Sequence, residues 1–205
     1  MANRKLIYQF RVELLEIEPT IWRRIQVPAD YSFWDLHVAI QDSMGWLDYH
    51  LHAFRVKKPR GRKVVEIGMP DEETERDCLA GWEVPISTYF VAPGVAAAYD
   101  YDFGDSWHHQ VLLEGILLGE PSVKYPLCVA GERACPPEDC GGVSGYAELL
   151  QVLSKPRTAE YKATAAWLKC HAKNYFPYQA DQFAPGEVEF WNPAKRWKIA
   201  FGKDA

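Results

Sequence analysis

Alternation of apolar and polar residues dominates the first part of the chain. Between residues 6 and 15 every second position is apolar. Residues 21–27 alternate in a similar way, with Ile21, Arg23, Ile25 and Val27 on one side, before Pro28 interrupts the pattern. A period of two residues predicts a β-strand with one buried face in each segment. Two shorter apolar runs, residues 51–56 and 64–67, predict a third and a fourth strand, with the basic run at residues 57–63 as a solvated hairpin tip.

The next pattern has the spacing of a helix. Apolar residues fall on one stripe between residues 32 and 45, and Ser32 stands where a helix N-cap would lie. Asp35 adds negative charge to the first turn, and Gly45 suits the position just past the last turn. These residues predict an amphipathic helix that packs on the sheet.

The second half of the chain changes from strands to helices. Residues 95–103 and 107–117 alternate strongly and predict a hairpin closed at residues 103–106, whereas the segments on either side of Pro156 have helical spacing. Residues 71–77 are acidic and are expected to be solvated. Strands followed by helices indicate an α+β fold. We expect a mainly antiparallel sheet with a helix packed on it, and a helical C-terminal segment.

Composition narrows the class of protein. The chain has 205 residues, 48% of them hydrophobic, and a formal net charge of −5. Its length predicts a single domain over residues 1–205. The acidic balance makes nucleic-acid binding through the body of the domain unexpected. No apolar run is long enough to span a bilayer, so we expect no membrane association and a cytoplasmic location, where the five cysteines would stay reduced.

Four long stretches carry a family resemblance. In order and spacing they resemble the plasmid pRiA4b ORF-3-like family, also called the transposon-passenger TnpR-like family. The resemblance covers about residues 5–172, so residues 173–205 are an aromatic-rich C-terminal extension. It implies an α+β domain found in chromosomes, plasmids and mobile elements, and it implies no activity. The stretches are PTIWRRIQVPADYSFWDLHVAIQDSMGW, HLHAFRV, YDYDFGDSWHHQVLLEGI and YPLCVAGERACPPEDCGGVSGYAELLQVL.

Three cysteines lie close together in the sequence. Cys128, Cys135 and Cys140 could bind zinc if a fourth ligand, such as His109 or Asp139, completed the site. A disulfide and a reactive thiol are alternatives. A further alternative is a loop stiffened by its two prolines, with the cysteines as small buried groups.

A second set of polar residues suggests a hydrolase. His50 and His52 would share one face of a strand, and Asp102, Asp105 and His109 flank or follow the predicted hairpin turn. Together they could hold zinc, manganese or iron and activate water, for example to cleave a phosphoester. Alternatively, the two aspartates bond the turn backbone and the histidines are packed in the core.

Two arginines follow each other on the second predicted strand. Strand parity sends Arg23 and Arg24 to opposite faces, so one should be buried and should pair with a carboxylate, such as Asp102 or Asp105. The sequence contains no complete set of catalytic residues with the spacing that identifies a known class of enzyme. The sequence therefore favours a non-enzymatic binding or accessory module linked to mobile elements, acting through a protein partner. The alternatives are the metal-dependent hydrolase and a structural zinc module.

Overall fold

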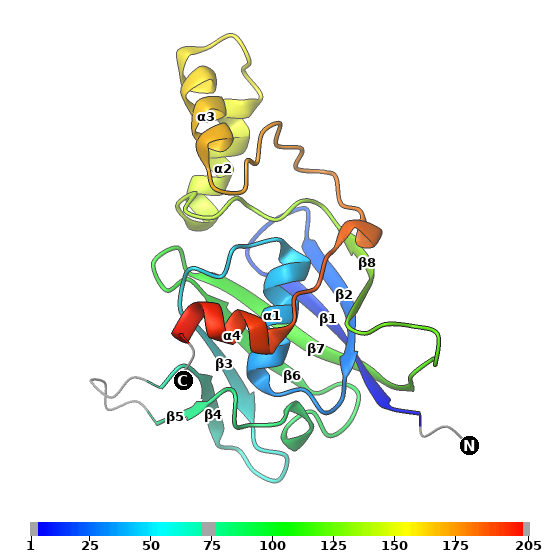
Figure 1. Ribbon diagram of the computed structural model, residues 1–205. Coiled ribbons are helices and arrows are strands. Elements are labelled where there is room, and N and C mark those ends of the chain that lie inside the picture. The colour runs from blue at the N-terminus through cyan, green and yellow to red at the C-terminus, as the bar shows by residue number, and fades with distance from the viewer. Residues whose placement is uncertain (1–3, 71–76, 203–205) are drawn as a thin grey trace.

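One eight-stranded sheet forms the body of the protein (Figure 1). The computed structural model describes residues 4–70 and 77–202, so most of the acidic segment expected at residues 71–77 lies outside the described residues. The spatial order of the strands is β5-β4-β3-β6-β7-β1-β2-β8. They are β1 (Leu6–Leu14), β2 (Ile21–Pro28), β3 (His52–Lys57), β4 (Val64–Gly68), β5 (Cys78–Ala80), β6 (Ala96–Tyr101), β7 (Trp107–Leu118) and β8 (Leu127–Glu132).

Neighbouring strands are antiparallel, except that β4 and β5 are parallel. Alternate residues of β1 and β2 point into the core, as the period-two pattern predicts, and β7 pairs along the whole of β1. β3 and β4 form the predicted hairpin, whose tip at residues 58–63 is exposed. The α+β class and the mainly antiparallel sheet are therefore confirmed.

Helix α1 (Phe33–Met44) packs against one face of the sheet, as Figure 1 shows. Its N-terminus has a full capping box: the Ser32 side chain accepts from the backbone N–H of Asp35, whose carboxylate accepts from the N–H of Ser32. Its C-terminus ends at Gly45, whose φ of 90° lies in the left-handed region that glycine adopts without strain. Local sequence signals therefore set both ends of this helix.

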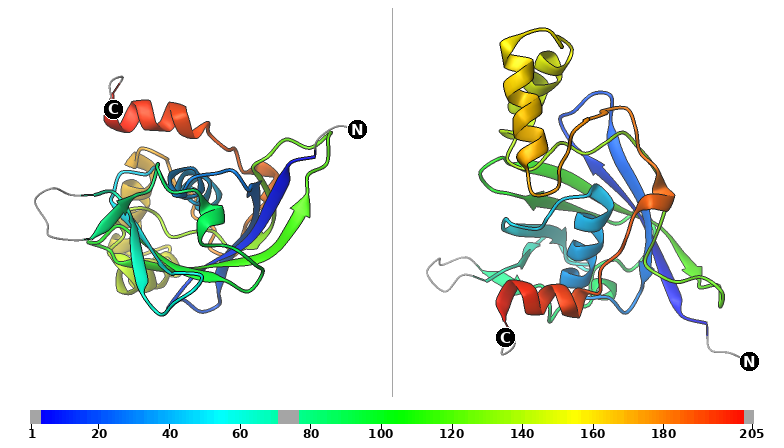
Figure 2. Two further views of the ribbon diagram at one scale, coloured as in Figure 1. Left: turned by 90° about the horizontal axis from the view of Figure 1, so that it is seen from below. Right: turned by 45° about the horizontal axis from the view of Figure 1, so that its top comes forward.

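Two further helices, α2 (Gly142–Leu153) and α3 (Ala159–Cys170), form a hairpin that projects from the body (Figure 1). The segment after α3 then runs back along the body, through a short 3-10 turn at Pro185–Glu187, to α4 (Pro193–Phe201), as the right-hand view of Figure 2 shows. A second 3-10 turn lies at Ile86–Thr88. Within the described residues, no helix is both long and apolar enough to cross a membrane.

Three elements were not predicted from the sequence: β5, β8 and α4. Strand β5 has only three residues, and β8 is irregular, because its pairing with β2 shifts register between Arg24 and Ile25. Helix α4 has no buried residue, so it lacks a strong apolar stripe. The cysteine region is thus not only a loop, since its first part, with Cys128, is an edge strand of the sheet.

Candidate functional site

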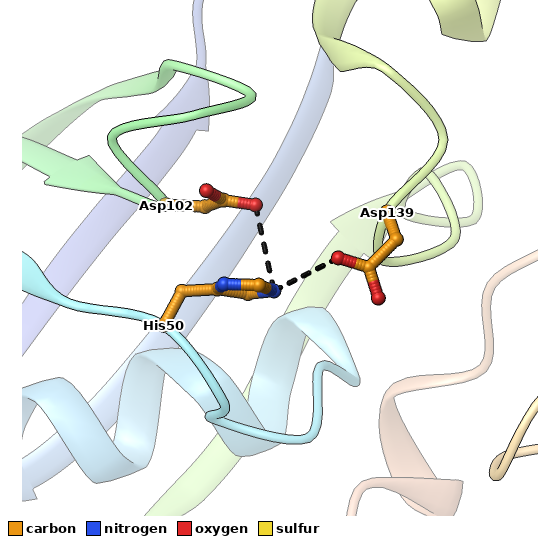
Figure 3. Close-up of side chains that lie close together, drawn as sticks. All are labelled: His50, Asp102 and Asp139. Carbon is orange, nitrogen blue, oxygen red and sulfur yellow. Dashed lines mark ion pairs between the residues drawn. The ribbon is translucent and has the colours of Figure 1, made fainter.

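Three side chains from separate parts of the chain converge at one point (Figure 3). The Nε2 atom of His50 lies 3.5 Å from Oδ2 of Asp102 and 3.0 Å from Oδ1 of Asp139. Their potential ligand atoms all lie within 4.8 Å of one another, and among the residues that the structure describes this is the one such group of three or more His, Cys, Asp and Glu. We call these residues the His–Asp–Asp triad.

Each member of the triad lies on a connection between regular elements. His50 is in the loop from α1 to β3, Asp102 follows β6 directly, and Asp139 is in the loop from β8 to α2. Both aspartates have left-handed backbone conformations, with φ of 55° and 57°. Asp tolerates this conformation better than most residues, so both turns suit the residue that occupies them.

One oxygen of Asp102 is committed to the turn and the other is not. Its Oδ1 accepts from the backbone N–H groups of Gly104 at 3.0 Å and Asp105 at 3.2 Å. The interpretation that this aspartate bonds the turn backbone therefore holds for one of its oxygens. Its Oδ2 faces His50. The turn thus orients a carboxylate whose second oxygen can act as a ligand.

The loop of Asp139 is fixed to the body by its neighbours. The carboxylate of Glu138, which is 1% exposed, accepts from the hydroxyl of Tyr101 and from the backbone N–H of Leu47 at 2.8 Å. The indole N–H of Trp46 donates to the carbonyl of Pro136 at 3.0 Å. These bonds join the three loops that carry the triad, so the triad is held by surrounding structure.

The contacts of His50 suit a metal ion shared with the two aspartates better than a simple ion pair. Nε2 is buried and makes no hydrogen bond with either carboxylate, although both oxygens are within ion-pair distance. The Asp139 oxygen, at 3.0 Å, therefore lies off the axis along which a ring N–H would donate, and the Asp102 oxygen, at 3.5 Å, is at the outer limit of hydrogen-bond distance. Ligands bound at roughly 2.0–2.2 Å to one metal ion are about 2.8–3.6 Å apart at angles near 90–110°. The two measured separations lie within this range.

The site is open on one side. The Asp102 side chain is 9% exposed, whereas those of His50 and Asp139 are 30% and 55% exposed. The Nε2 atom of His50 is itself buried, so solvent reaches the group from the side of Asp139. In catalytic zinc sites, three protein ligands bind the ion and water takes the remaining place. One imidazole and two carboxylates also suit manganese and iron.

Three residues of the predicted hydrolase site lie outside the triad. Asp105 accepts from the backbone N–H of Gly141 at 3.1 Å, at the start of α2. His52 is buried, and its ring stacks on that of His37 with centroids 3.4 Å apart. Burial and then the neighbouring His37 place the pKa of His52 well below its ordinary value. His52 and His50 do not share a face of one strand, because His50 precedes β3.

His109 is a core residue. It is fully buried on β7, and its Nδ1 lies 3.2 Å from the carbonyl oxygen of Tyr99. Burial lowers its pKa to about 4, so the ring is neutral at physiological pH. Its Nε2 is buried without a hydrogen-bond partner among the described residues. The packed-histidine alternative describes this placement.

Sequence reasoning did not join Asp139 to His50. Asp139 was considered only as a fourth ligand for the cysteines, because it lies between Cys135 and Cys140 in the sequence. The one available signal was an acidic residue in a loop stiffened by Pro136 and Pro137. Such a local pattern does not predict which distant segment the loop packs against.

The cysteines do not form a three-ligand group with His109 within the described part of the chain. All five cysteines are free thiols. Burial raises the pKa of Cys128 and Cys135, and the nearby charge of Arg23 offsets this only in part. Burial, followed by the charge of Asp105, raises the pKa of Cys140 to about 12. These environments favour neutral thiols over thiolates.

Arg23 is buried as parity predicts, but its partners differ from the prediction. It donates to the backbone carbonyls of Ser43, Trp22 and Glu132 at 2.8–2.9 Å, and neither Asp102 nor Asp105 pairs with it. Arg24, on the opposite face, pairs with Glu114, with Nη2 and Oε1 2.8 Å apart. Burial lowers the pKa of the Arg23 guanidinium.

Comparisons with known proteins give a consistent result. The family model described as "Plasmid pRiA4b ORF-3-like protein" matches residues 6–187, which extends beyond residue 172 into the tail. The uncharacterized protein y4hQ of Sinorhizobium fredii (strain NBRC 101917 / NGR234) is 31% identical over 172 residues, which are 82% of this chain and 83% of that protein.

A solved structure is similar in fold and sequence. It is the crystal structure of a protein of unknown function, MM3350, from Methanosarcina mazei Go1. The TM-score is 0.80 at 39% identity, and the match covers 92% of this chain and 100% of that one. With the family model matching most of its length, the chain belongs to the plasmid pRiA4b ORF-3-like protein family.

Proposed function

We propose that this protein binds a divalent metal ion through His50, Asp102 and Asp139 and uses it in hydrolysis, with a phosphoester as the substrate class. The observation that carries the proposal is the position of His50 Nε2, 3.0 and 3.5 Å from two carboxylate oxygens without a hydrogen bond to either. A metal ion in such a site would lower the pKa of bound water and supply a nucleophile at neutral pH.

The chain's own residues would supply position and charge. The two carboxylates would offset the charge of the ion, and the turn that binds Oδ1 of Asp102 would keep its Oδ2 directed at the ion. The exposed side of Asp139 leaves room for a substrate to approach. The proposal keeps only two residues of the set predicted from sequence, His50 and Asp102, and adds Asp139.

Metal content is the first test. Protein purified without a His-tag should bind one Zn²⁺ or Mn²⁺ per chain by elemental analysis and titration calorimetry. Asp102→Asn keeps the oxygen that accepts from the turn but removes a charged ligand, so affinity should fall by at least about tenfold. Asp105→Asn makes the same charge change in the same hairpin and should leave affinity unchanged. Absence of stoichiometric metal, or equal effects of the two variants, would overturn the site.

Turnover is the second test. The metal-loaded protein should hydrolyse bis(p-nitrophenyl) phosphate, and Asp102→Asn should abolish that activity. Metal binding without turnover on mono- and diester probes would reject the hydrolase and retain the metal site. The proposed role would then be the one that the sequence favours, a non-enzymatic binding or accessory module linked to mobile elements and acting through a protein partner.

A further inference from the structure

A groove separates the body from the tail that returns along it. Its volume is about 880 Å³, and none of the three triad residues lines it. Small-molecule sites commonly have volumes of roughly 300–1,000 Å³ and mostly apolar walls with a few polar groups. The walls include the aromatic side chains of Trp46, Tyr175, Tyr178, Phe183 and Trp191. The groove therefore has the size and lining of a ligand site.

Arg23 lines this groove from the side of the sheet. The residue is 1% exposed, and its Nε and Nη1 donate to three backbone carbonyls. Among the described residues, Nη2 has no hydrogen-bond partner. Phe183 covers one face of the guanidinium, with Cζ 3.6 Å from the ring centroid. One edge of a buried, fixed cation is thus left without a partner.

The position of Phe183 depends on a glycine. A Cβ at Gly131 would lie 2.4 Å from Cε1 of Phe183, so any other residue there would displace the ring from the arginine. The edge strand β8 thus leaves space for a tail residue to pack on Arg23. The contact between Phe183 and Arg23 therefore depends on both segments, the tail that carries Phe183 and the strand β8 that carries Gly131.

No described carboxylate compensates the charge of Arg23. The titratable groups that face it are Cys135, Cys128 and Tyr178, and the pKa of each is raised, so all three are neutral at physiological pH. Three carboxylates line the groove, those of Asp42, Glu187 and Glu189; Asp42 pairs with Arg196 at 2.7 Å, and none of the three forms an ion pair with Arg23. A buried charge without a counter-ion costs free energy, which a bound anion would recover.

A second guanidinium lies in the same lining. Arg196, from α4, contributes a buried Nε that has no hydrogen-bond partner among the described residues. Its Nη2 and Nη1 are directed to Asp42 and Asp48. The groove thus offers unsatisfied N–H donors from two arginines beside aromatic rings. Guanidinium donors and carboxylate oxygens form strong, charge-assisted hydrogen bonds.

We infer that the groove binds a small molecule that carries a carboxylate on a flat apolar body, with the carboxylate on Nη2 of Arg23 and the body against the aromatic walls. The inference does not depend on the metal site, because the two sites share no residue. The inference concerns binding only, so its test is independent of the test of hydrolysis.

Matched acid and amide probes test the charge. Phenylacetate and indole-3-acetate should bind to the full chain in titration calorimetry at least about tenfold more tightly than phenylacetamide and indole-3-acetamide. Arg23→Lys should weaken binding of the acids by at least about tenfold, because lysine lacks the planar fork. Arg24→Lys is the matched control, since the neighbouring arginine is on the opposite face, pairs with Glu114 and does not line the groove.

A measurement on the unaltered protein covers the case in which Arg23→Lys does not fold. The ¹⁵N–¹H side-chain resonances of Arg23 should shift on addition of the acids and not of the amides. The inference is overturned if no acid binds at about 10 mM, if acids and amides bind equally, or if the Arg23 resonances do not respond. An equal effect of Arg24→Lys would also overturn it.

Discussion

Glu138 and Tyr101 share a buried hydrogen bond, in which the phenol donates to the carboxylate, and each residue immediately precedes an aspartate of the His–Asp–Asp triad. Glu138 comes before Asp139, and Tyr101 comes before Asp102. The bond therefore sets the separation of two carboxylates that are distant in the sequence. It makes Glu138 and Tyr101 positioning residues for the proposed site.

Tyr101→Phe should loosen this arrangement. The ring would keep its stacking on Trp46, but the buried carboxylate of Glu138 would lose a donor, which costs about 1–3 kcal/mol of unfolding free energy. Metal affinity should fall by roughly 10–100-fold, as for other groups that orient ligands. Urea unfolding and calorimetry measure both effects.

Tyr125→Phe is the control for that prediction. The hydroxyl of Tyr125 accepts one exposed backbone N–H, from Glu120 at 3.3 Å, so its loss should change stability by less than about 0.5 kcal/mol. If Tyr101→Phe lowers stability but leaves metal affinity unchanged, the hydrogen bond supports the fold and does not position the ligands.

The cysteines should differ in their rate of reaction with a thiol reagent, according to their burial and thiol pKa. Cys170 is exposed, whereas Cys128 and Cys135 are buried and the pKa of Cys140 is raised to about 12. Because the thiolate is the reactive form, iodoacetamide at pH 8 should modify Cys170 first and should spare Cys128, Cys135 and Cys140 until the protein unfolds. Peptide mass spectrometry identifies the sites. Rapid modification of Cys140 in the folded protein would contradict this environment.

Stability should decrease in mild acid because of His109. Burial lowers its folded pKa from 6.5 to about 4, so between these values the unfolded chain binds a proton that the folded chain does not. The contribution is complete above pH 6.5 and is lost as the pH falls toward 4, and it amounts to about 3 kcal/mol. The measurement is the free energy of unfolding from pH 7 to 4.

The comparison for this prediction is His109→Phe, which removes the titrating group and retains a ring of similar shape. Carboxylates also destabilise proteins in acid, so the informative quantity is the difference between the two pH profiles. The unaltered protein should lose more stability than the variant between pH 6.5 and 4. Parallel profiles would show that His109 does not stay neutral in the fold.

Docking of α4 should depend on Arg196. Its guanidinium is directed to Asp42 and Asp48, whose side chains are 4% and 6% exposed. Burial raises the pKa of Asp42, although the backbone N–H of Trp191 and the charge of Arg196 oppose this. Arg196→Gln would leave the enclosed carboxylate of Asp42 without its cation and that of Asp48 with His37 as its remaining side-chain partner, so α4 should separate from α1.

Hydrogen exchange measures that separation. Amides of residues 194–201 should lose protection in Arg196→Gln while those of the sheet keep it, and Trp197 should report greater solvent exposure by fluorescence. Lys195→Gln removes an exposed charge from the same helix and should change neither readout. Unchanged exchange in Arg196→Gln would indicate that the aromatic contacts between Trp34 and Trp197 suffice.

Much of the fold was predictable because its signals are local. The ends of α1 follow from Ser32, Asp35 and Gly45, whose effects act within one or two turns of the chain. The alternation in β1 and β2 predicts both strands and the burial of Arg23, since neighbouring residues of a strand face opposite ways. The sequence by itself determined these elements, the α+β class and the family.

Tertiary structure decided what these elements bring together. Asp139 meets His50 only because a loop between β8 and α2 folds onto the end of β6, and no local pattern states where a loop will pack. Likewise, the carbonyls that Arg23 contacts belong to three separate segments, one of them in the unpredicted strand β8. Periodicity and capping act between near neighbours in the chain, whereas a ligand site depends on contacts between distant segments, which form only when the whole sheet and its tail have packed.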